Sequence, residues 1–81
     1  MEIGKRLRNL RKERKETQTQ VAEAVGTAMR HYQRFELGEA LPGLEIFCAL
    51  ADHFQVNADY LLGRTDVREM LPPSEEVPEE I

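Results

Sequence analysis

The sequence predicts an all-α fold: a compact domain of five short helices, followed by an acidic flexible tail. Apolar residues recur at intervals of three and four through the first 65 positions, as they do on one face of an amphipathic helix. Glycine or proline separates most of these runs. The apolar alternation typical of strands is absent. We therefore expect a domain at residues 1–65 and a tail at residues 66–81.

The first two helices are predicted from their apolar stripes and from a capping pattern between them. Thr17 and Gln20 have the spacing of a capping box, in which the hydroxyl accepts a backbone N–H and the amide reaches back. Gly26 favours the left-handed conformation that ends a helix. The residues expected to face inward are Ile3, Leu7, Leu10, Val21, Ala22 and Val25.

Three further helices are predicted after Gly26. The third covers about residues 28–37 and is closed by Gly38, while Pro42 indicates a loop. Asn57 is a suitable N-cap for a short fifth helix that Gly63 closes. The residues expected to face inward are Ala28, Tyr32, Phe35, Leu44, Phe47, Leu50, Ala51, Phe54, Leu61 and Leu62.

The tail differs from the domain in composition. Residues 72–81 contain three prolines and four glutamates, a segment too polar to bury itself, and we expect it to be disordered. Val67, Met70 and Leu71 keep helical spacing just before it, which allows a short extra helical turn at residues 66–71. Because such an apolar triplet seldom stays solvated beside a folded domain, we expect it to form a dimer contact. The alternative is that residues 66–81 are only a disordered polyanion that repels or mimics DNA near the basic face.

Charge is distributed unevenly along the chain. The net charge is −4, yet residues 1–34 carry +5 and residues 35–81 carry −9. Residues 66–81 alone carry −5, so residues 1–65 come to +1. A nearly neutral domain with a basic amino-terminal part is compatible with a nucleic-acid partner, and the overall acidity does not exclude one.

Residue types and spacings argue against several other classes of protein. No apolar run approaches the ~20 residues of a membrane helix, and no secretory signal is expected. Cys48 is the single cysteine, which excludes an internal disulfide, favours a cytoplasmic location and predicts a buried or half-buried side chain. His31 and His53 have no metal-ligand spacing around them, and no catalytic grouping or phosphate loop occurs. We expect no enzyme activity, metal or cofactor.

A tight turn around Gly26 and Thr27 joins the second and third expected helices. Two short helices joined in this way form a helix-turn-helix, whose second helix enters the major groove of DNA. Residues 3–64 resemble the phage Cro and repressor (Xre-type) helix-turn-helix family, which implies a lambda-repressor-like DNA-binding domain. The matching segments are Leu7-Arg8-Asn9-Leu10-Arg11, Thr17-Gln18, Val21-Ala22, Gly26, Glu36-Leu37-Gly38, Pro42-Gly43-Leu44-Glu45, Leu50-Ala51 and Val56-Asn57-Ala58-Asp59-Tyr60-Leu61-Leu62-Gly63.

The sequence departs from this family at three positions. Ala28 stands where a Ser or Thr usually caps the third helix, which predicts either a weaker cap or a start shifted so that Thr27 caps. Glu16 stands where leucine is common, so one core contact is expected to be missing. Gly43 replaces a common serine at the start of the fourth helix, a change worth only about a few tenths of a kcal/mol.

The helical repeat predicts which side chains of the third helix face DNA. At about 100° per residue, Arg30 and Arg34 lie opposite the inward Tyr32 and Phe35, with Gln33 beside them. Arginine pairs with guanine and glutamine with adenine in the major groove, and a flanking methionine can touch a thymine methyl. The resemblance implies the same base-reading set: Ala28, Met29, Arg30, Gln33 and Arg34.

A different set is expected to contact phosphates. Gln18 begins the second helix, where free N–H groups attract anions, and the resemblance implies a backbone contact for it. Loop N–H groups between Gly38 and Gly43 are a second candidate. The resemblance also implies that Arg11 pairs with Glu36, partly buried, and points to a phosphate. An ordinary surface ion pair is the alternative for these two residues.

The predicted function is sequence-specific binding of double-stranded DNA by a transcriptional regulator, most simply a repressor. One such domain reads few base pairs, so a homodimer on a palindromic operator is expected. The alternative is a helix-turn-helix module that holds a protein, as an antitoxin or an antagonist-binding regulator does. A protein antagonist or co-regulator is accordingly the second expected partner, and no membrane partner is expected.

Overall fold

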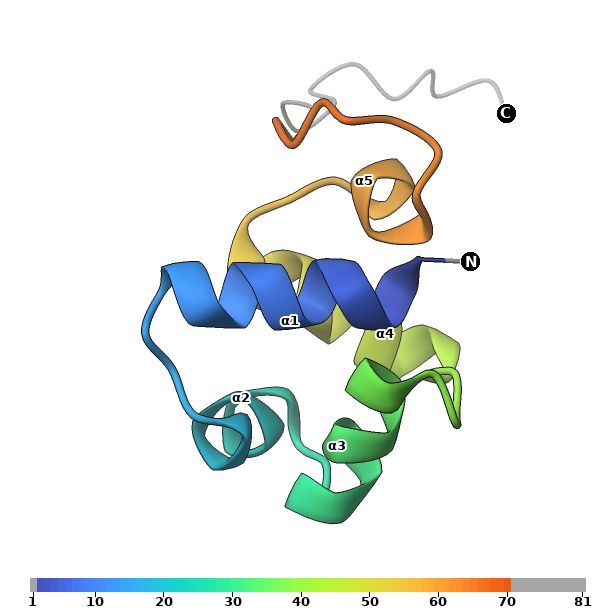
Figure 1. Cartoon of the computed structure of the whole chain (residues 1–81). Coiled ribbons are helices and arrows are strands. Elements are labelled where there is room, and N and C mark those ends of the chain that lie inside the picture. The colour runs from blue at the N-terminus through green and yellow to red at the C-terminus, as the bar shows by residue number, and fades with distance from the viewer. Residues whose placement is uncertain (1, 71–81) are drawn as a thin grey trace, which may run out of the picture.

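A computed structural model describes residues 2–70, which form five helices and no strand (Figure 1). The all-α prediction is confirmed. Short connections join the helices, as expected from the glycines and the proline between them. The helices are α1 (Ile3–Glu13), α2 (Gln18–Val25), α3 (Met29–Leu37), α4 (Leu44–Phe54) and α5 (Ala58–Leu62).

Helix α1 crosses the middle of the molecule and separates two regions. In Figure 1, α5 lies on one side of α1, and α2 and α3 lie on the other. Helix α1 contacts both α3 and α5, while α4 contacts α2 and α5. The pair α2 and α3 is therefore supported from behind by α1 and α4, and the outer side of α3 is left to solvent.

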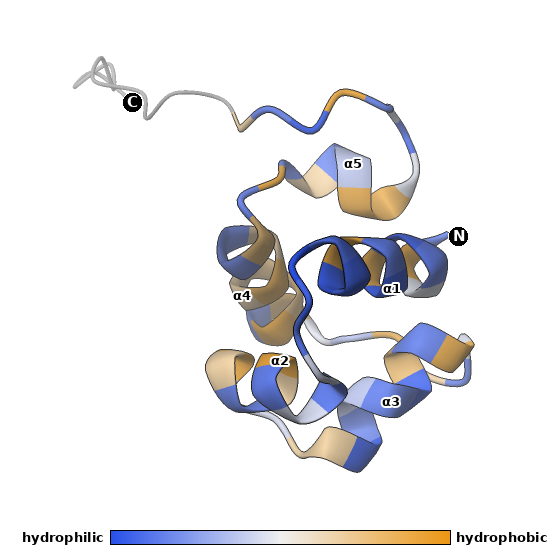
Figure 2. Cartoon of the chain, turned by 60° about the vertical axis from the view of Figure 1, so that its left-hand side comes forward, coloured by the Kyte–Doolittle hydropathy of each residue, from blue (hydrophilic) through white to orange (hydrophobic). Residues whose placement is uncertain are grey.

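The core is made of the apolar faces of all five helices. Figure 2 shows mainly hydrophilic residues along α3 and longer hydrophobic stretches in α4. This difference agrees with burial, since α3 contributes only two residues to the core. Buried hydrophobic residues are Ile3, Leu7, Leu10, Val21, Ala22, Val25, Tyr32, Phe35, Leu50, Ala51, Phe54, Val56, Tyr60 and Leu61.

Gly4 allows α1 to lie directly against the end of α3. A Cβ at this position would lie 2.5 Å from the carbonyl oxygen of Phe35 and 2.6 Å from that of Glu36. Both neighbours are backbone atoms, so any larger residue would push the two helices apart. Gly4 was not among the residues predicted to face inward, although a glycine inside an apolar helical stripe can have a packing reason.

Helices α2 and α3 differ in how their first turns are capped. Thr17 forms the predicted capping box: its Oγ1 accepts from the N–H of Gln20 (3.0 Å), and its N–H donates to Oε1 of Gln20 (2.8 Å). Ala28 is the N-cap of α3 and offers no side-chain bond. The cap is therefore the weaker one, and the start is not shifted to Thr27.

Two expectations about α4 are wrong. Leu44 is 78% exposed because it is the first residue of the helix, ahead of the turn that reaches the core. Cys48 is exposed as well, because α4 buries its other side through Leu50, Ala51 and Phe54. The inward face of this helix therefore begins at the half-buried Phe47 rather than at Leu44.

Residues 64–70, here called the strap, are not helical, so the expected turn at residues 66–71 is wrong over its described part. Asn57 explains the extended course. Its side-chain N–H groups donate to the carbonyls of Val67 (2.8 Å) and Glu69 (2.9 Å), and its own N–H donates to Arg68 O (3.0 Å). These carbonyls are thereby taken from a helical ladder. Leu71 and the expected disordered segment 72–81 lie outside the described residues.

Candidate nucleic-acid interface

The turn between α2 and α3 is closed by backbone hydrogen bonds. Gly26 has φ +81°, the left-handed conformation that glycine adopts without strain. The N–H of Thr27 donates to the carbonyl of Ala22 at 2.9 Å. Only residues 26–28 separate the helices, so the orientation of α3 relative to α2 is set by this turn and by the core beneath it.

The structure places four of the five predicted base-reading residues on the outer side of α3 and the fifth, Ala28, directly before the helix. Met29 is 41% exposed, the Arg34 side chain is 54% exposed, Arg30 is exposed, and Gln33 is half-buried. Ala28 was expected to face inward in the helical projection, but it is exposed because it precedes the helix as its cap.

One exposed side chain on this helix was missed by the sequence analysis. His31 lies beside Arg30 on the surface, and its ring meets the ring of Phe35 edge-on at 4.6 Å between centroids. An exposed imidazole can donate to or accept from a base or a phosphate. The signal available in the sequence was its position between Arg30 and Gln33, which are both predicted contact residues.

A network of polar side chains joins α1, α2 and α3 behind this face. Arg11 donates to Glu36 from Nε (2.7 Å to Oε2) and from Nη2 (3.0 Å to Oε1). Its Nη1 donates to the carbonyl of Glu16 at 3.1 Å. Gln18 donates from Nε2 to Oε1 of Glu36 at 3.1 Å. Glu36 is thus the centre of the network and fixes both Arg11 and Gln18.

Burial and hydrogen bonding act in opposite directions on Glu36. Its side chain is only 3% exposed, and burial by itself raises the pKa of a carboxyl group. The donors from Arg11 and Gln18 outweigh this, so the pKa lies below its ordinary value. The hydrogen bonds of the same pair raise the pKa of Arg11, and burial, followed by the neighbouring Glu36, raises that of Tyr32. The network is therefore an ion pair at neutral pH.

A hollow of about 240 Å³ opens over this network at the junction of α1, α2 and α3. It brings the predicted phosphate-contacting Gln18 next to the predicted base-reading Gln33. Its six lining residues are Arg8, Arg11, Gln18, Gln33, Glu36 and Leu37. Arg8 is exposed and adds a further guanidinium that the sequence analysis left without a role. Guanidinium groups of this kind suit phosphate oxygens.

Part of the loop between α3 and α4 has its N–H groups already bound to backbone carbonyls. The N–H of Gly38 already donates to the carbonyl of Phe35 (3.2 Å) as part of the helix end. Gly43 is the N-cap of α4, and no side chain caps this helix. The N–H groups that suit a phosphate are therefore those of the first turn of α4, directly after this loop.

A second polar cluster lies away from α3. Glu16 accepts from Nε2 of His53 at 3.0 Å and lies 3.2 Å from Nε of Arg14. Nη1 of Arg14 donates to the carbonyl of His53 at 2.8 Å. Glu16 therefore ties the α1–α2 turn to the end of α4, where the resemblance implied only a missing core contact. Within residues 2–70, no cluster of His, Cys, Asp or Glu could hold a metal.

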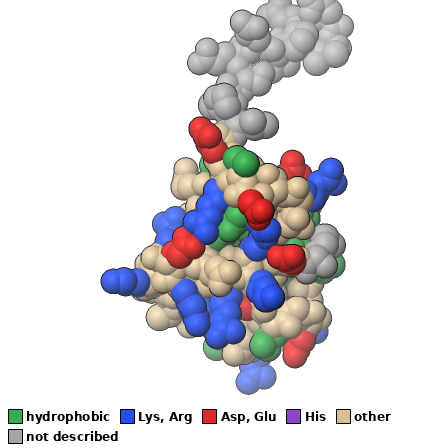
Figure 3. Space-filling model, turned by 45° about the horizontal axis from the view of Figure 1, so that its top comes forward, with side chains coloured by type: hydrophobic (Ala, Val, Ile, Leu, Met, Phe, Trp, Pro, Cys, Tyr) green, Lys and Arg blue, Asp and Glu red, His purple; other side chains and the backbone are tan. Residues whose placement is uncertain are grey.

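The surface carries charged side chains of both signs. Figure 3 shows basic and acidic side chains on the same face, with several basic ones close together in its lower half. Among residues 2–70, every helix is too short or too polar to cross a membrane.

Residues 7–61 match the helix-turn-helix family, and the chain belongs to this family in its Xre-type branch. The family consists of transcriptional regulators and is not enzymatic. The match covers α2 and α3, the turn between them and most of the supporting helices.

Individual relatives and a solved structure agree with this assignment. The chain is 39% identical over 64 residues to the cryptic phage CTXphi transcriptional repressor RstR of Vibrio cholerae, a match covering 79% of this chain and 57% of that one. It is 43% identical over 61 residues to the HTH-type transcriptional regulator YobD of Bacillus subtilis, covering 75% and 54%. The chain thus spans little more than half the length of these relatives.

The solved structure is the DNA-binding domain of the P22 C2 repressor. It superposes with a TM-score of 0.73 at 30% identity and covers 85% of this chain and 90% of that domain. The lambda-repressor-like fold predicted from the sequence is confirmed.

Proposed function

We propose that this chain is a repressor that binds double-stranded DNA in the cytoplasm, as a homodimer on a palindromic operator. One observation carries the proposal: the outer side of α3 presents Arg30, Gln33 and Arg34 to solvent while Tyr32 and Phe35 anchor the same helix in the core. The kinship with phage repressors supports it.

Base readout is assigned to α3. Arg30 and Arg34 each present a guanidinium that can pair with O6 and N7 of guanine, and Gln33 can pair with adenine. Met29 lies on the flank, where a thymine methyl would be met, and Ala28 allows close approach at the helix start. Repression then needs only steric exclusion of polymerase from the site.

Phosphate contact is assigned to Gln18, supported by the way it is held. Gln18 is the first residue of α2, and Glu36 fixes its amide. Arg11 in turn fixes Glu36. The main role of Arg11 is therefore to position Glu36 and Gln18, and its phosphate contact is secondary. Gly43 and the first turn of α4 supply the remaining backbone donors, and Gly38 contributes through the shape of the loop.

Dimerisation lets the protein recognise a longer stretch of DNA than one domain can. Two α3 helices in successive major grooves read half-sites one helical turn apart, which doubles the specific contacts. Val67, Met70 and Leu71 are assigned to the dimer contact. Val67 is 61% exposed and Met70 is 38% exposed, in keeping with such a role.

A protein antagonist or co-regulator is the alternative partner. Leu37, Leu41 and Leu44 are exposed close to α3 and would suit a protein surface. The transcriptional regulators among the relatives favour DNA as the primary partner.

The test is binding of labelled duplexes selected from a random oligonucleotide pool. Arg30→Ala or Arg34→Ala should each weaken binding by about 1–3 kcal/mol and relax the preference at one base position. Gln18→Ala should weaken all sequences about equally, because phosphates carry no sequence information. Arg64→Ala is the matched control, since it removes one exposed positive charge beside α5, across α1 from α3.

Two results would contradict the proposal. One is a failure of DNA recognition, seen either as a selected pool without a common sequence or as no binding of any duplex at low salt, which would favour the protein-binding alternative. The other is that Gln18→Ala changes base preference while Arg34→Ala does not, which would reverse the assigned roles.

A further inference from the structure

The hydroxyl of Tyr32 is a buried polar group that takes no part in the hydrogen bonds described above. Tyr32 is 0% exposed, and no group of residues 2–70 forms a hydrogen bond with its hydroxyl. The ring is held in the core, edge-on to the ring of Phe35 at 6.2 Å between centroids. A buried hydroxyl without a hydrogen bond destabilises a fold, and such groups are rare in folded proteins. The position of this one therefore needs a physical explanation.

Glu36 is the neighbour to which this hydroxyl can donate. It lies one helical turn after Tyr32 on α3, so the two side chains share one side of the helix. They are close enough to affect each other. Burial, followed by Glu36, raises the pKa of Tyr32, and the effect of burial on the pKa of Glu36 is countered by Arg11 and then by Tyr32. The hydroxyl therefore keeps its proton at neutral pH and can act only as a donor toward the charged carboxylate.

The carboxylate of Glu36 can accept one hydrogen bond more than it does. A carboxylate offers about four acceptor positions, two on each oxygen. Oε1 accepts from both Arg11 and Gln18, whereas Oε2 accepts, within residues 2–70, from Arg11 alone. The side chain of Glu36 is only 3% exposed, so solvent has little access to the remaining position. The same buried region thus contains a donor without an acceptor and an acceptor position without a donor.

Gln18 is the member of the network whose amide is also assigned to DNA. It is half-buried at the start of α2, and its Nε2 donates to Glu36 at 3.1 Å, the longest of the three hydrogen bonds to this carboxylate. A phosphate oxygen is a charged acceptor and competes with Glu36 for the same nitrogen. When Gln18 turns toward a phosphate, Glu36 keeps only the donors of Arg11.

We propose that Tyr32 is a positioning residue of the DNA interface, whose hydroxyl donates to the Glu36 carboxylate once the Gln18 amide has moved to a phosphate. The exchange keeps the number of donors to Glu36 at three. Gln18 is then released without leaving the buried charge short of hydrogen bonds, and Arg11 stays in place. The inference rests on the phosphate contact that the proposed function assigns to Gln18.

A double-mutant cycle of Tyr32→Phe and Gln18→Ala tests the exchange in the absence of DNA. Phenylalanine keeps the ring and removes only the hydroxyl. In the natural chain, Tyr32→Phe should leave the folding equilibrium constant unchanged or raise it, because the hydroxyl removed there is unbonded. In the Gln18→Ala chain, where the hydroxyl donates to Glu36, the same change should lower the constant roughly tenfold. Urea denaturation of the four full-length chains measures both effects.

Binding to duplexes from the selected pool tests the consequence for DNA. Tyr32→Phe should weaken binding to all of them roughly tenfold and leave the base preference unchanged, because the effect passes through a phosphate contact. A role in packing alone would not weaken binding by a chain that is as stable as the natural one. Tyr60→Phe is the matched control, since Tyr60 is 7% exposed and lies in α5, across α1 from α3. It should leave binding unchanged.

Three results would overturn the inference. The first is an effect of Tyr32→Phe on stability that has the same sign and size with and without Gln18, because the hydroxyl then does not replace the amide. The second is an unchanged DNA affinity of Tyr32→Phe. The third is a changed base preference, which would place its effect in α3 itself. If no chain binds a duplex while the cycle gives opposite effects, the proposed function fails and the replacement of Gln18 by Tyr32 stands.

Discussion

Two arginine–glutamate pairs join distant parts of this chain with nearly the same geometry and different surroundings. Arg11 and Glu36 pair behind the helix-turn-helix, at 2.7 and 3.0 Å. Arg68 of the strap pairs with Glu13, the last residue of α1, at 2.7 and 2.7 Å. The first pair is 14% and 3% exposed, and the second is 45% and 51% exposed.

This difference teaches that burial, rather than distance, decides what an ion pair does here. Water solvates Arg68 and Glu13 whether they are paired or not, so breaking the pair costs little. Glu36 has lost its water and depends on Arg11 and Gln18, so its loss leaves a partly buried cation without compensation. The strap pair positions a segment, whereas the buried pair supports the candidate interface.

The largest expected effect is that of Glu36→Ala. It should lower the free energy of unfolding by roughly 3–5 kcal/mol, because Arg11 stays behind without its carboxylate. A domain of this size has little more than that to lose. Chemical denaturation followed by circular dichroism measures the change. An unchanged midpoint would show that the two pairs are equivalent after all.

The second expected effect is a dependence of the folding stability on pH, which comes from the buried pair of Arg11 and Glu36. Because the pKa of Glu36 lies below its ordinary value of 4.5 in the folded state, its stabilisation is complete above that pH. It is lost as the pH falls further and the carboxylate is protonated. The stability difference between the natural chain and Glu36→Gln should therefore be constant from pH 7 to about 5 and shrink below it. A difference that grows on acidification would contradict this.

A smaller effect is expected at the start of α3, which lacks the cap that α2 has. Ala28→Ser should add about 0.5–2 kcal/mol, because the backbone at this position already has the extended conformation of a cap. Thermal unfolding measures the gain. Ala24→Ser is the matched control, since Ala24 is exposed within α2 and has no free helix end to cap.

The smallest effect is expected from Glu13→Gln, which weakens the exposed pair and keeps the shape of the side chain. Arg68 lowers the pKa of Glu13 through its hydrogen bonds, but solvent reaches both groups. The unfolding midpoint should therefore shift far less than in Glu36→Ala, and added salt should abolish the shift. An effect as large as that of Glu36→Ala would mean that the strap is as important to the fold as the buried network.

Much of this architecture could be predicted from the sequence because it depends on interactions between residues that are close in the chain. The capping box at Thr17 and Gln20, the left-handed ends at Gly26, Gly38 and Gly63, and the Asn57 cap depend on neighbouring residues only. The periodicity of three and four placed Tyr32 and Phe35 inward, and thereby placed Arg30 and Arg34 outward, because one helix has two opposite faces.

The pairing of Arg11 with Glu36 required the family resemblance, since 25 residues separate them in the chain. Periodicity alone specifies which side of a helix is apolar, but it does not specify which part of the helix contacts the neighbouring helices.

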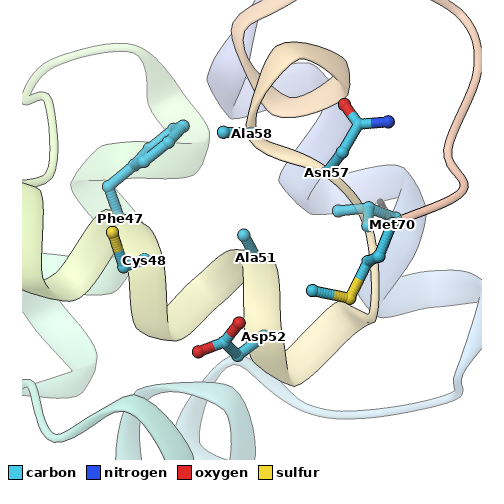
Figure 4. A pocket seen from close by; sticks show the side chains of 8 residues that line it. Phe47, Cys48, Ala51, Asp52, Asn57, Ala58 and Met70 are labelled. Atoms are coloured by element: carbon cyan, nitrogen blue, oxygen red, sulfur yellow. The ribbon is translucent and has the colours of Figure 1, made fainter. Parts of the chain in front are cut away.

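Only the tertiary structure decided the features that depend on where elements end against one another. Leu44 has the right spacing for the core but precedes the part of α4 that reaches it, and Cys48 lines a groove between α4 and the start of α5 (Figure 4). Gly4 matters because the backbone of α3 lies 2.5 Å from where a Cβ would be. Asn57 keeps the strap extended by binding carbonyls ten and twelve residues away. Side-chain spacing determines local structure, whereas these contacts form only after distant segments have packed together.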